Sequence, residues 1–183
     1  MSLGDGSAER DPTVELRALA HPVRLRILSL LTATEMTAAE VARELDLTHA
    51  NASYHLRHLL DAGVIQIAGE ERIRGGVAKR YRYDATRDFD RRRPSPDGAE
   101  PTRDHRLLYA TLATELRRRS QQARRSSNNF LTDAEFWIDP ETWQAVREQI
   151  ANAAETLHRA AQPPRAPGAV RVSATVALFQ MED

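Results

Sequence analysis

The chain has 183 residues, and its 26 lysines and arginines balance 26 aspartates and glutamates, so the formal net charge is zero. It contains no cysteine, which excludes disulfides, thiolate metal sites and cysteine nucleophiles. No stretch reaches the length of about 18 apolar residues that a membrane helix needs, and the first residues lack the apolar core of a signal peptide. These features favour a cytoplasmic protein without a membrane partner.

The balanced charge conceals a segregation along the chain. Residues 14–93 and 103–125 carry an excess of basic residues; the second range has seven arginines against two acidic residues. Residues 130–162 contain two arginines against six acidic residues. Such asymmetry suggests one portion that faces DNA and another that does not.

Four helices are expected in the first third of the chain. The first spans about residues 13–20, and the second begins at Pro22, because proline suits the first turn of a helix and disfavours helix in the residue before it. Thr37 fits an N-cap, with Glu40 as its capping-box partner. Thr48 caps a fourth helix that runs to about residue 62, and Gly63 suits the left-handed residue at its end.

A β-hairpin pattern follows these helices. Residues 64–67 begin a strand, residues 74–76 form a glycine-rich tip, and residues 77–83 return. Residues 84–102 are charged and rich in proline, which indicates a linker.

The last part of the chain predicts a helix over residues 104–125 with a narrow apolar stripe, typical of a helix that packs against a partner. Alternating apolar residues then predict a strand over 130–138, an amphipathic helix opened by Asp139 and Pro140, and a final strand over 170–179. The expected class is α+β, mainly α. Its parts are a tail at 1–12, a winged helix-turn-helix domain at 13–86, a linker at 87–103, a dimerisation helix at 104–127 and a strand–helix–strand unit at 128–183. The last unit is expected to serve dimerisation, through strands that pair across the dimer, effector binding, or both.

Two motifs carry a family resemblance. AHPVRL at residues 20–25 and SYHLRHL at residues 53–59 resemble the ArsR/SmtB family of bacterial winged-helix repressors, and DAGVI at residues 61–65 fits as well. The resemblance covers roughly residues 13–84. It implies a homodimeric, cytoplasmic repressor that binds double-stranded DNA by sequence.

The resemblance does not extend to metal sensing. The family's thiolate ligands would fall at Thr37 and Ala39, neither of which binds a soft metal. Asp104 and His105 open the later helix, but no further histidine or carboxylate follows at ligand spacing. We therefore expect no metal and no cofactor, and an effector, if one exists, other than a thiophilic metal.

The helix opened by Thr48 is expected to enter the major groove, where Asn51 is suited to a bidentate contact with adenine. Arg57 and His58 are better placed for phosphates, and His55 is either a phosphate contact or part-buried. The expected DNA-contacting residues of the helix and of the basic ribbon are Thr48, His49, Asn51, Ser53, Tyr54, His55, Arg57, His58, Arg72, Arg74, Lys79 and Arg80. The alternative for the helix is a solvated face, and for the ribbon an edge strand charged against aggregation.

The later helices suggest an interface and a candidate pocket. Dimerisation is expected through Leu16, Leu108, Tyr109, Leu112 and Leu116. The arginines at 117–119, 124 and 125 favour a solvated face over a second DNA surface. One interpretation of Phe136, Trp137, Trp143 and Phe179 is an effector pocket; the alternative is the core of a small unit, which needs such residues anyway.

The leading hypothesis is a homodimeric transcriptional repressor on a pseudo-palindromic operator. One alternative is a protein-interaction module that uses the winged helix as a scaffold, which the basic ribbon and Asn51 disfavour. Another is an enzyme in the last unit, but the acidic residues at 133, 135, 139 and 141 resemble a strand edge and a helix start. No phosphate loop or nucleophile motif accompanies them, so no catalytic residue is expected.

Overall fold

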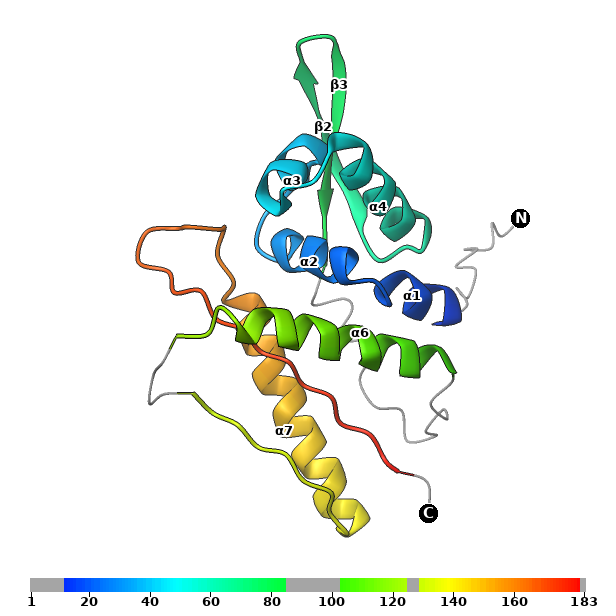
Figure 1. Cartoon of the computed structure of the whole chain (residues 1–183), viewed down its shortest axis with the longest axis vertical. Helices are drawn as coiled ribbons and strands as arrows, with labels where there is room; N and C mark the ends of the chain where they lie inside the picture. The colour runs from blue at the N-terminus through cyan, green and yellow to red at the C-terminus, as the bar shows by residue number, and fades with distance from the viewer. Residues whose placement is uncertain (1–11, 85–102, 125–128, 182–183) are drawn as a thin grey trace, which may run out of the picture.

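The computed structural model of the chain describes residues 12–84, 103–124 and 129–181. Four short helices and a three-stranded antiparallel sheet form one end of the molecule, and two longer helices lie toward the other (Figure 1). The mixed, mainly helical class predicted from the sequence is confirmed. The predicted tail at 1–12 and linker at 87–103 lie almost wholly outside the described residues.

The first two helices meet at a proline break, as predicted. α1 (Pro12–Leu19) ends before His21, whose extended backbone and ring Nδ1 cap α2 (Pro22–Leu31) by accepting from the Val23 N–H at 3.2 Å. Arg24 donates its guanidinium to the carbonyls of Ala18 and Arg17, the latter at 2.9 Å. A cation at the carbonyl end of a helix stabilises it, so Arg24 fastens the end of α1 to the start of α2.

The helix-turn-helix proper consists of α3 (Ala38–Leu45) and α4 (His49–Asp61). A capping box opens α3: the Thr37 hydroxyl accepts from the Glu40 N–H at 3.3 Å, and the Glu40 carboxylate accepts from the Thr37 N–H at 2.8 Å. The hydrogen bond from the Thr37 N–H lowers the pKa of Glu40, and a second bond to the carboxylate, donated by the Thr37 hydroxyl at 3.1 Å, lowers it further. The turn to α4 passes through Asp46 in the left-handed region (φ 55°), and Gly63 at φ 71° follows the end of α4.

The sheet has the strand order β1–β3–β2. β2 (Gln66–Ile73) and β3 (Gly76–Arg82) form the predicted hairpin, and β1 (Met36–Thr37) pairs with β3 at Tyr81 and Arg80. The sequence does not predict β1, because two residues are too few to show a strand period. β1 anchors the base of the hairpin beside the start of α3.

The core lies where α2, α3 and α4 meet the base of the sheet. Five aliphatic side chains are almost fully enclosed: Ile27, Leu31, Val41, Leu56 and Leu59. Burying each such side chain contributes about 1.5–3 kcal/mol to folding, so this cluster fixes the position of α4.

α6 (Arg103–Ser120) packs beneath α1 and α2 (Figure 1). The predicted apolar stripe is only partly correct. Leu108 joins the core, but Leu116 is 51% exposed and Glu115 is buried at 2%. The packing of α6 against α1 and α2 determines which of its side chains are buried. The apolar stripe in the sequence does not reveal this packing.

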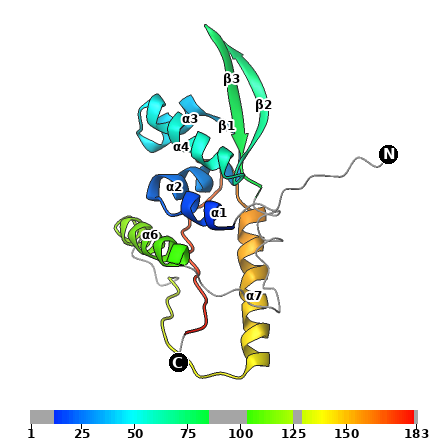
Figure 2. The same cartoon turned by 90° about the vertical axis from the view of Figure 1, so that its right-hand side faces the viewer.

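α7 (Pro140–Arg159) begins as predicted, with the Asp139 carboxylate accepting from the Thr142 N–H at 2.9 Å. The strands predicted on either side of it are wrong: residues 129–139 and 170–181 run extended but form no strand in the described chain. We call these two segments the C-terminal arms. A strand requires a hydrogen-bonded neighbour, and neither arm has one here. Figure 2 shows the second arm between α6 and α7.

Candidate nucleic-acid interface

The first turns of α4 present a polar, solvent-exposed surface. Thr48 caps the helix by accepting from the Asn51 N–H at 3.2 Å, while Ala52 and Leu56 face the core. Thr48, His49, Asn51, Tyr54, Arg57 and His58 are exposed, and Ser53 and His55 are half-buried. The predicted residues of α4 therefore lie on one element. A helix N-terminus with free N–H groups and exposed polar side chains is suited to a phosphate backbone and base edges.

Aromatic rings join α4 to the junction of α1 and α2. The His55 ring lies 4.6 Å from that of His21, and Tyr54 packs edge-on against His58 at 4.5 Å. His55 Nδ1 is buried and has no hydrogen-bond partner among the described residues. Burial lowers the pKa of both His21 and His55, and the charges of Arg24 and His58 lower it further. Both rings are thus held neutral at pH 7, so they pack together without mutual repulsion.

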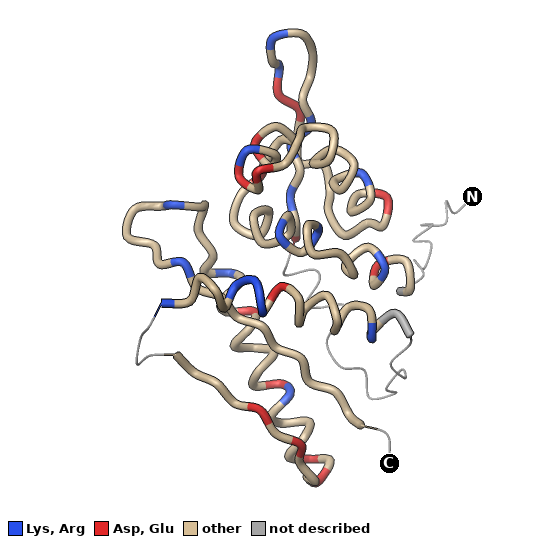
Figure 3. Tube along the Cα trace, viewed as in Figure 1, with Lys and Arg blue, Asp and Glu red and all other residues tan. Residues whose placement is uncertain are grey.

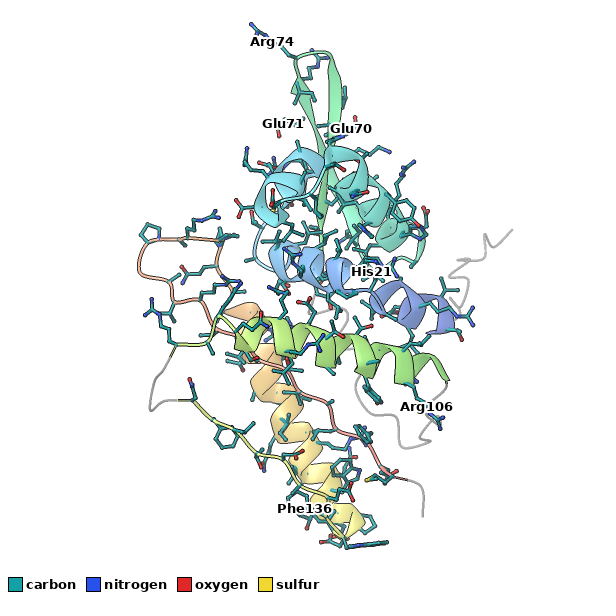
Figure 4. All side chains as sticks on the ribbon, in the orientation of Figure 1. His21, Glu70, Glu71, Arg74, Arg106 and Phe136 are labelled. Atoms are coloured by element: carbon teal, nitrogen blue, oxygen red, sulfur yellow. The ribbon has the colours of Figure 1, made fainter. Side chains whose placement is uncertain are left out.

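The hairpin forms a wing that projects beyond the helices (Figure 1). Its tip turns at Gly75, with φ 95°, and carries exposed Arg72 and Arg74. Arg74 points away from the body, whereas Glu70 and Glu71 lie lower on the wing (Figure 4). Lys79 pairs in register with Glu70. The positive charge is therefore concentrated at the tip.

Arg80 differs from the other basic residues of the wing. Its guanidinium lies 2.8 Å from the Glu71 carboxylate, 3.7 Å from that of Glu40 and 4.0 Å from that of Glu35, and it donates to the Glu35 carbonyl at 2.6 Å. These contacts join β3 to β2, to α3 and to the residue before β1. Arg80 is therefore placed to orient the wing, a role that the sequence alone does not reveal.

The comparison with protein-family models supports a DNA-binding role for this surface. Residues 19–67 match the family model of a helix-turn-helix domain. The match begins at the end of α1 and ends in the first residues of β2, so it includes the whole of α4. No curated protein matches the chain.

A helix-turn-helix domain indicates a DNA-binding regulator rather than an enzyme. The acidic residues of the first C-terminal arm and the start of α7, at 133, 135, 139 and 141, are exposed, and Asp139 serves as the cap of α7. In the part of the chain that the structure describes, no three histidines or carboxylates gather as metal ligands. Thr37 is buried, and its hydroxyl serves the capping box of α3.

Outside the helix-turn-helix domain, the four aromatic residues of the predicted effector pocket have different surroundings. Phe136 and Trp137 are 75% and 95% exposed, whereas Phe179 stacks on Tyr109 of α6 at 5.1 Å. Trp143 lies under the guanidinium of Arg147 at 5.5 Å. Phe136 and Trp137 are therefore too exposed to line an enclosed pocket.

A polar cavity of about 450 Å³ lies elsewhere, between the helix-turn-helix domain and the end of α7. Its lining includes Arg82 and Asp84 after β3, and His158 and Arg159 of α7. Arg159 is paired with Glu155 at 2.6 Å. The cavity therefore has a polar lining, unlike the apolar pocket that the sequence suggests.

The predicted dimerisation residues lie along α1 and α6. Leu16 and Leu112 are half-buried, and Leu108 packs on the chain's own core. Leu116 keeps half of its side chain exposed. None of the described helices is long and apolar enough to cross a membrane.

Proposed function

We propose that the chain is a sequence-specific transcriptional repressor of the ArsR/SmtB-like type, acting as a homodimer on a pseudo-palindromic operator. One observation carries the proposal: the capped, exposed N-terminal half of α4 begins near the base of a wing whose tip carries Arg72 and Arg74 (Figures 1 and 4). A helix and a basic ribbon on one side of a domain match the major groove and the adjacent backbone.

Each element has a distinct task in this mode. Thr48 and the first N–H groups of α4 bind a phosphate, and Asn51 reads a base edge in the groove. Arg57 and His58 bind phosphates beyond the helix start, and Arg74 binds the backbone at the wing. Two copies present two α4 helices to half-sites about 34–36 Å apart or a multiple of that.

Fluorescence anisotropy with the promoter region of the chain's own gene and with a shuffled duplex tests the proposal. The wild-type chain is expected to bind the promoter at least about 1,000-fold more tightly at physiological salt. Affinity should fall steeply with salt, because phosphate contacts release counterions. Equal affinity for the two duplexes overturns the proposal.

Two variants distinguish contacts with bases from contacts with phosphates. Asn51→Ala is expected to weaken promoter binding and leave binding to the shuffled duplex unchanged, whereas Arg74→Glu weakens both and reduces the salt dependence. Arg106→Glu is the matched control, because Arg106 is an exposed arginine of α6 remote from the wing (Figure 4). If Arg74→Glu and Arg106→Glu behave alike, the wing does not contact DNA.

A further inference from the structure

The C-terminal arms expose far more apolar surface than a stable monomer normally does. In the first arm, Phe130, Leu131 and Trp137 are 90%, 91% and 95% exposed. In the second, Val170 and Val172 are 80% and 71% exposed, and the whole of α7 contains no fully buried residue. The exposed aromatic side chains of the arms together present on the order of 600 Å². A patch of that size marks an interaction surface.

The arms also have the pattern of strands that lack a neighbour. In the first arm Phe130, Phe136 and Ile138 are an even number of residues apart, so they would share one face when the arm pairs as a strand. Neither arm forms a strand ladder in the described chain. Extended backbone of this kind is a ready template for pairing with another strand.

Two buried polar atoms point to incomplete packing in the same unit. Trp143 Nε1 on α7 and Thr175 Oγ1 on the second arm are buried without a hydrogen-bond partner among the described residues. A buried donor without a partner costs about 1–3 kcal/mol, so native structures rarely retain one. An additional strand or a shift of α7 on assembly would supply the missing partners.

The charges of the unit are arranged to complement a second copy. The acidic side chains Asp133, Glu135 and Glu141 lie near the start of α7, whereas Arg117 and Arg124 lie near the end of α6. In Figure 3 the acidic positions of this unit gather mainly toward its lower end and the basic positions toward its upper end. A two-fold axis between antiparallel copies brings each acidic end to the other copy's basic end.

We propose that the two C-terminal arms and α7 form the interface with a second copy of this chain, and that the arms pair as strands across it. The inference rests on the homodimer of the proposed function and names the surface that makes it. The aromatic and aliphatic side chains of the arms supply an area comparable to the roughly 800 Å² per partner of a standard interface.

The same surface fixes the spacing of the two DNA-binding ends. The second arm follows α6 through the Phe179–Tyr109 stack and through Arg119, which donates to Ser173 Oγ at 3.4 Å. α6 in turn packs on α1 and α2. Dimerisation through the arms therefore orients each α4 helix relative to the other.

Sedimentation velocity of the full chain over a range of concentrations tests the interface. Wild type is expected to be a dimer, and Trp137→Glu is expected to raise the dimer dissociation constant on the order of 30-fold, as for a central aromatic contact. Ile73→Glu is the matched control, because Ile73 is an exposed apolar residue at the wing tip and remains outside the interface. A monomeric wild type, or equal dissociation constants for the two variants, overturns the inference.

Charge reversal provides a test that does not depend on a destabilised fold. The double variants Asp133→Arg/Glu135→Arg and Arg117→Glu/Arg124→Glu should each dimerise weakly, since like charges then meet across the axis. An equimolar mixture should form a heterodimer, because both contacts become attractive again. Failure of the mixture to associate, with both variants folded by circular dichroism, contradicts the antiparallel arrangement.

The two proposals fail in distinguishable ways. If the chain dimerises through the arms but binds its promoter and shuffled DNA equally, the proposed regulatory function is wrong and the proposed interface is still supported. Specific promoter binding by a chain whose dimerisation ignores Trp137→Glu overturns the interface and leaves the regulator standing.

Discussion

Arg165 donates to a carboxylate oxygen of Glu44 at 2.9 Å, and this ion pair joins the loop after α7 to α3 of the helix-turn-helix domain. The two residues are 121 positions apart in the chain. Arg165 itself adopts a left-handed backbone with φ 63°, which is uncommon for a residue with a side chain. The hydrogen bond with Arg165 lowers the pKa of Glu44.

Removing this ion pair should loosen the loop without unfolding the domain. Arg165→Ala is expected to return the pKa of Glu44 toward 4.5 and to speed amide exchange in residues 160–169. A carbon-detected NMR titration and hydrogen exchange measure the two effects. Arg171→Ala, at an exposed arginine of the same unit, is the control. An unchanged Glu44 titration would contradict the pairing.

The capping box of α3 should contribute to stability through the Thr37 hydroxyl. Thr37→Ala is expected to lower the free energy of unfolding by about 1–2 kcal/mol, because the Glu40 N–H loses its acceptor. Thr37→Ser keeps the hydroxyl and should recover most of the loss. Urea denaturation monitored by circular dichroism compares the three chains, and equal loss in the two variants would assign the effect to the methyl group instead.

On α6, loss of the Glu115 carboxylate should destabilise the chain more than loss of the Leu116 side chain. Glu115 is 2% exposed and accepts two hydrogen bonds from Arg118 at 2.7 and 3.0 Å, whereas Leu116 is 51% exposed. Glu115→Ala is expected to destabilise the chain by about 1–3 kcal/mol, since the Arg118 guanidinium loses its partner. Leu116→Ala should cost less than half of that. Thermal unfolding of the two variants shows which loses more stability. A larger loss in Leu116→Ala would mean that Leu116, and not Glu115, lies on the buried face of α6.

The neutral pair of His21 and His55 should make stability depend on pH. Both pKa values lie below the ordinary 6.5, so the unfolded chain takes up protons that the folded chain resists. Stability from this pair is complete above pH 6.5 and declines as the pH falls below it. His55→Gln should flatten the decline, and His49→Gln, at an exposed position of the same helix, should preserve it. Urea midpoints between about pH 5 and 8 are the measurement.

Local signals in the sequence were sufficient for most of the helix-turn-helix domain. Pro22, Thr37, Thr48 and Gly63 lie where they are predicted to begin or end helices. Capping and backbone restriction act within a few residues, so their effects are readable from the sequence. The exposed position of Asn51 follows from the same local argument.

The features of the fold that the sequence did not predict depend on contacts between segments far apart in the chain. The apolar period of α6 did not reveal that Glu115 is buried, because Arg118 offsets its charge only in the folded helix. Alternation in the C-terminal arms predicts strands, but a strand also needs a neighbour, which one chain does not provide. The role of Arg80 depends on carboxylates of α3, of β2 and of the residue before β1, which the sequence separates.

The irregularity in the wing has a consequence for how this element tolerates length changes. Ile67 pairs with Tyr81 and Gly69 with Arg80, so Ala68 is an additional residue in β2. Partners in a ladder share one side of the ribbon, and β3 runs without interruption, so the additional residue is absorbed in β2 and Arg72 stays opposite Val77. Deleting Ala68 would restore regular alternation in β2 and leave Arg72 on the same side of the ribbon. A chain of this kind that lacks Ala68 would therefore offer DNA the same contacts at the tip, from a ribbon with less local twist.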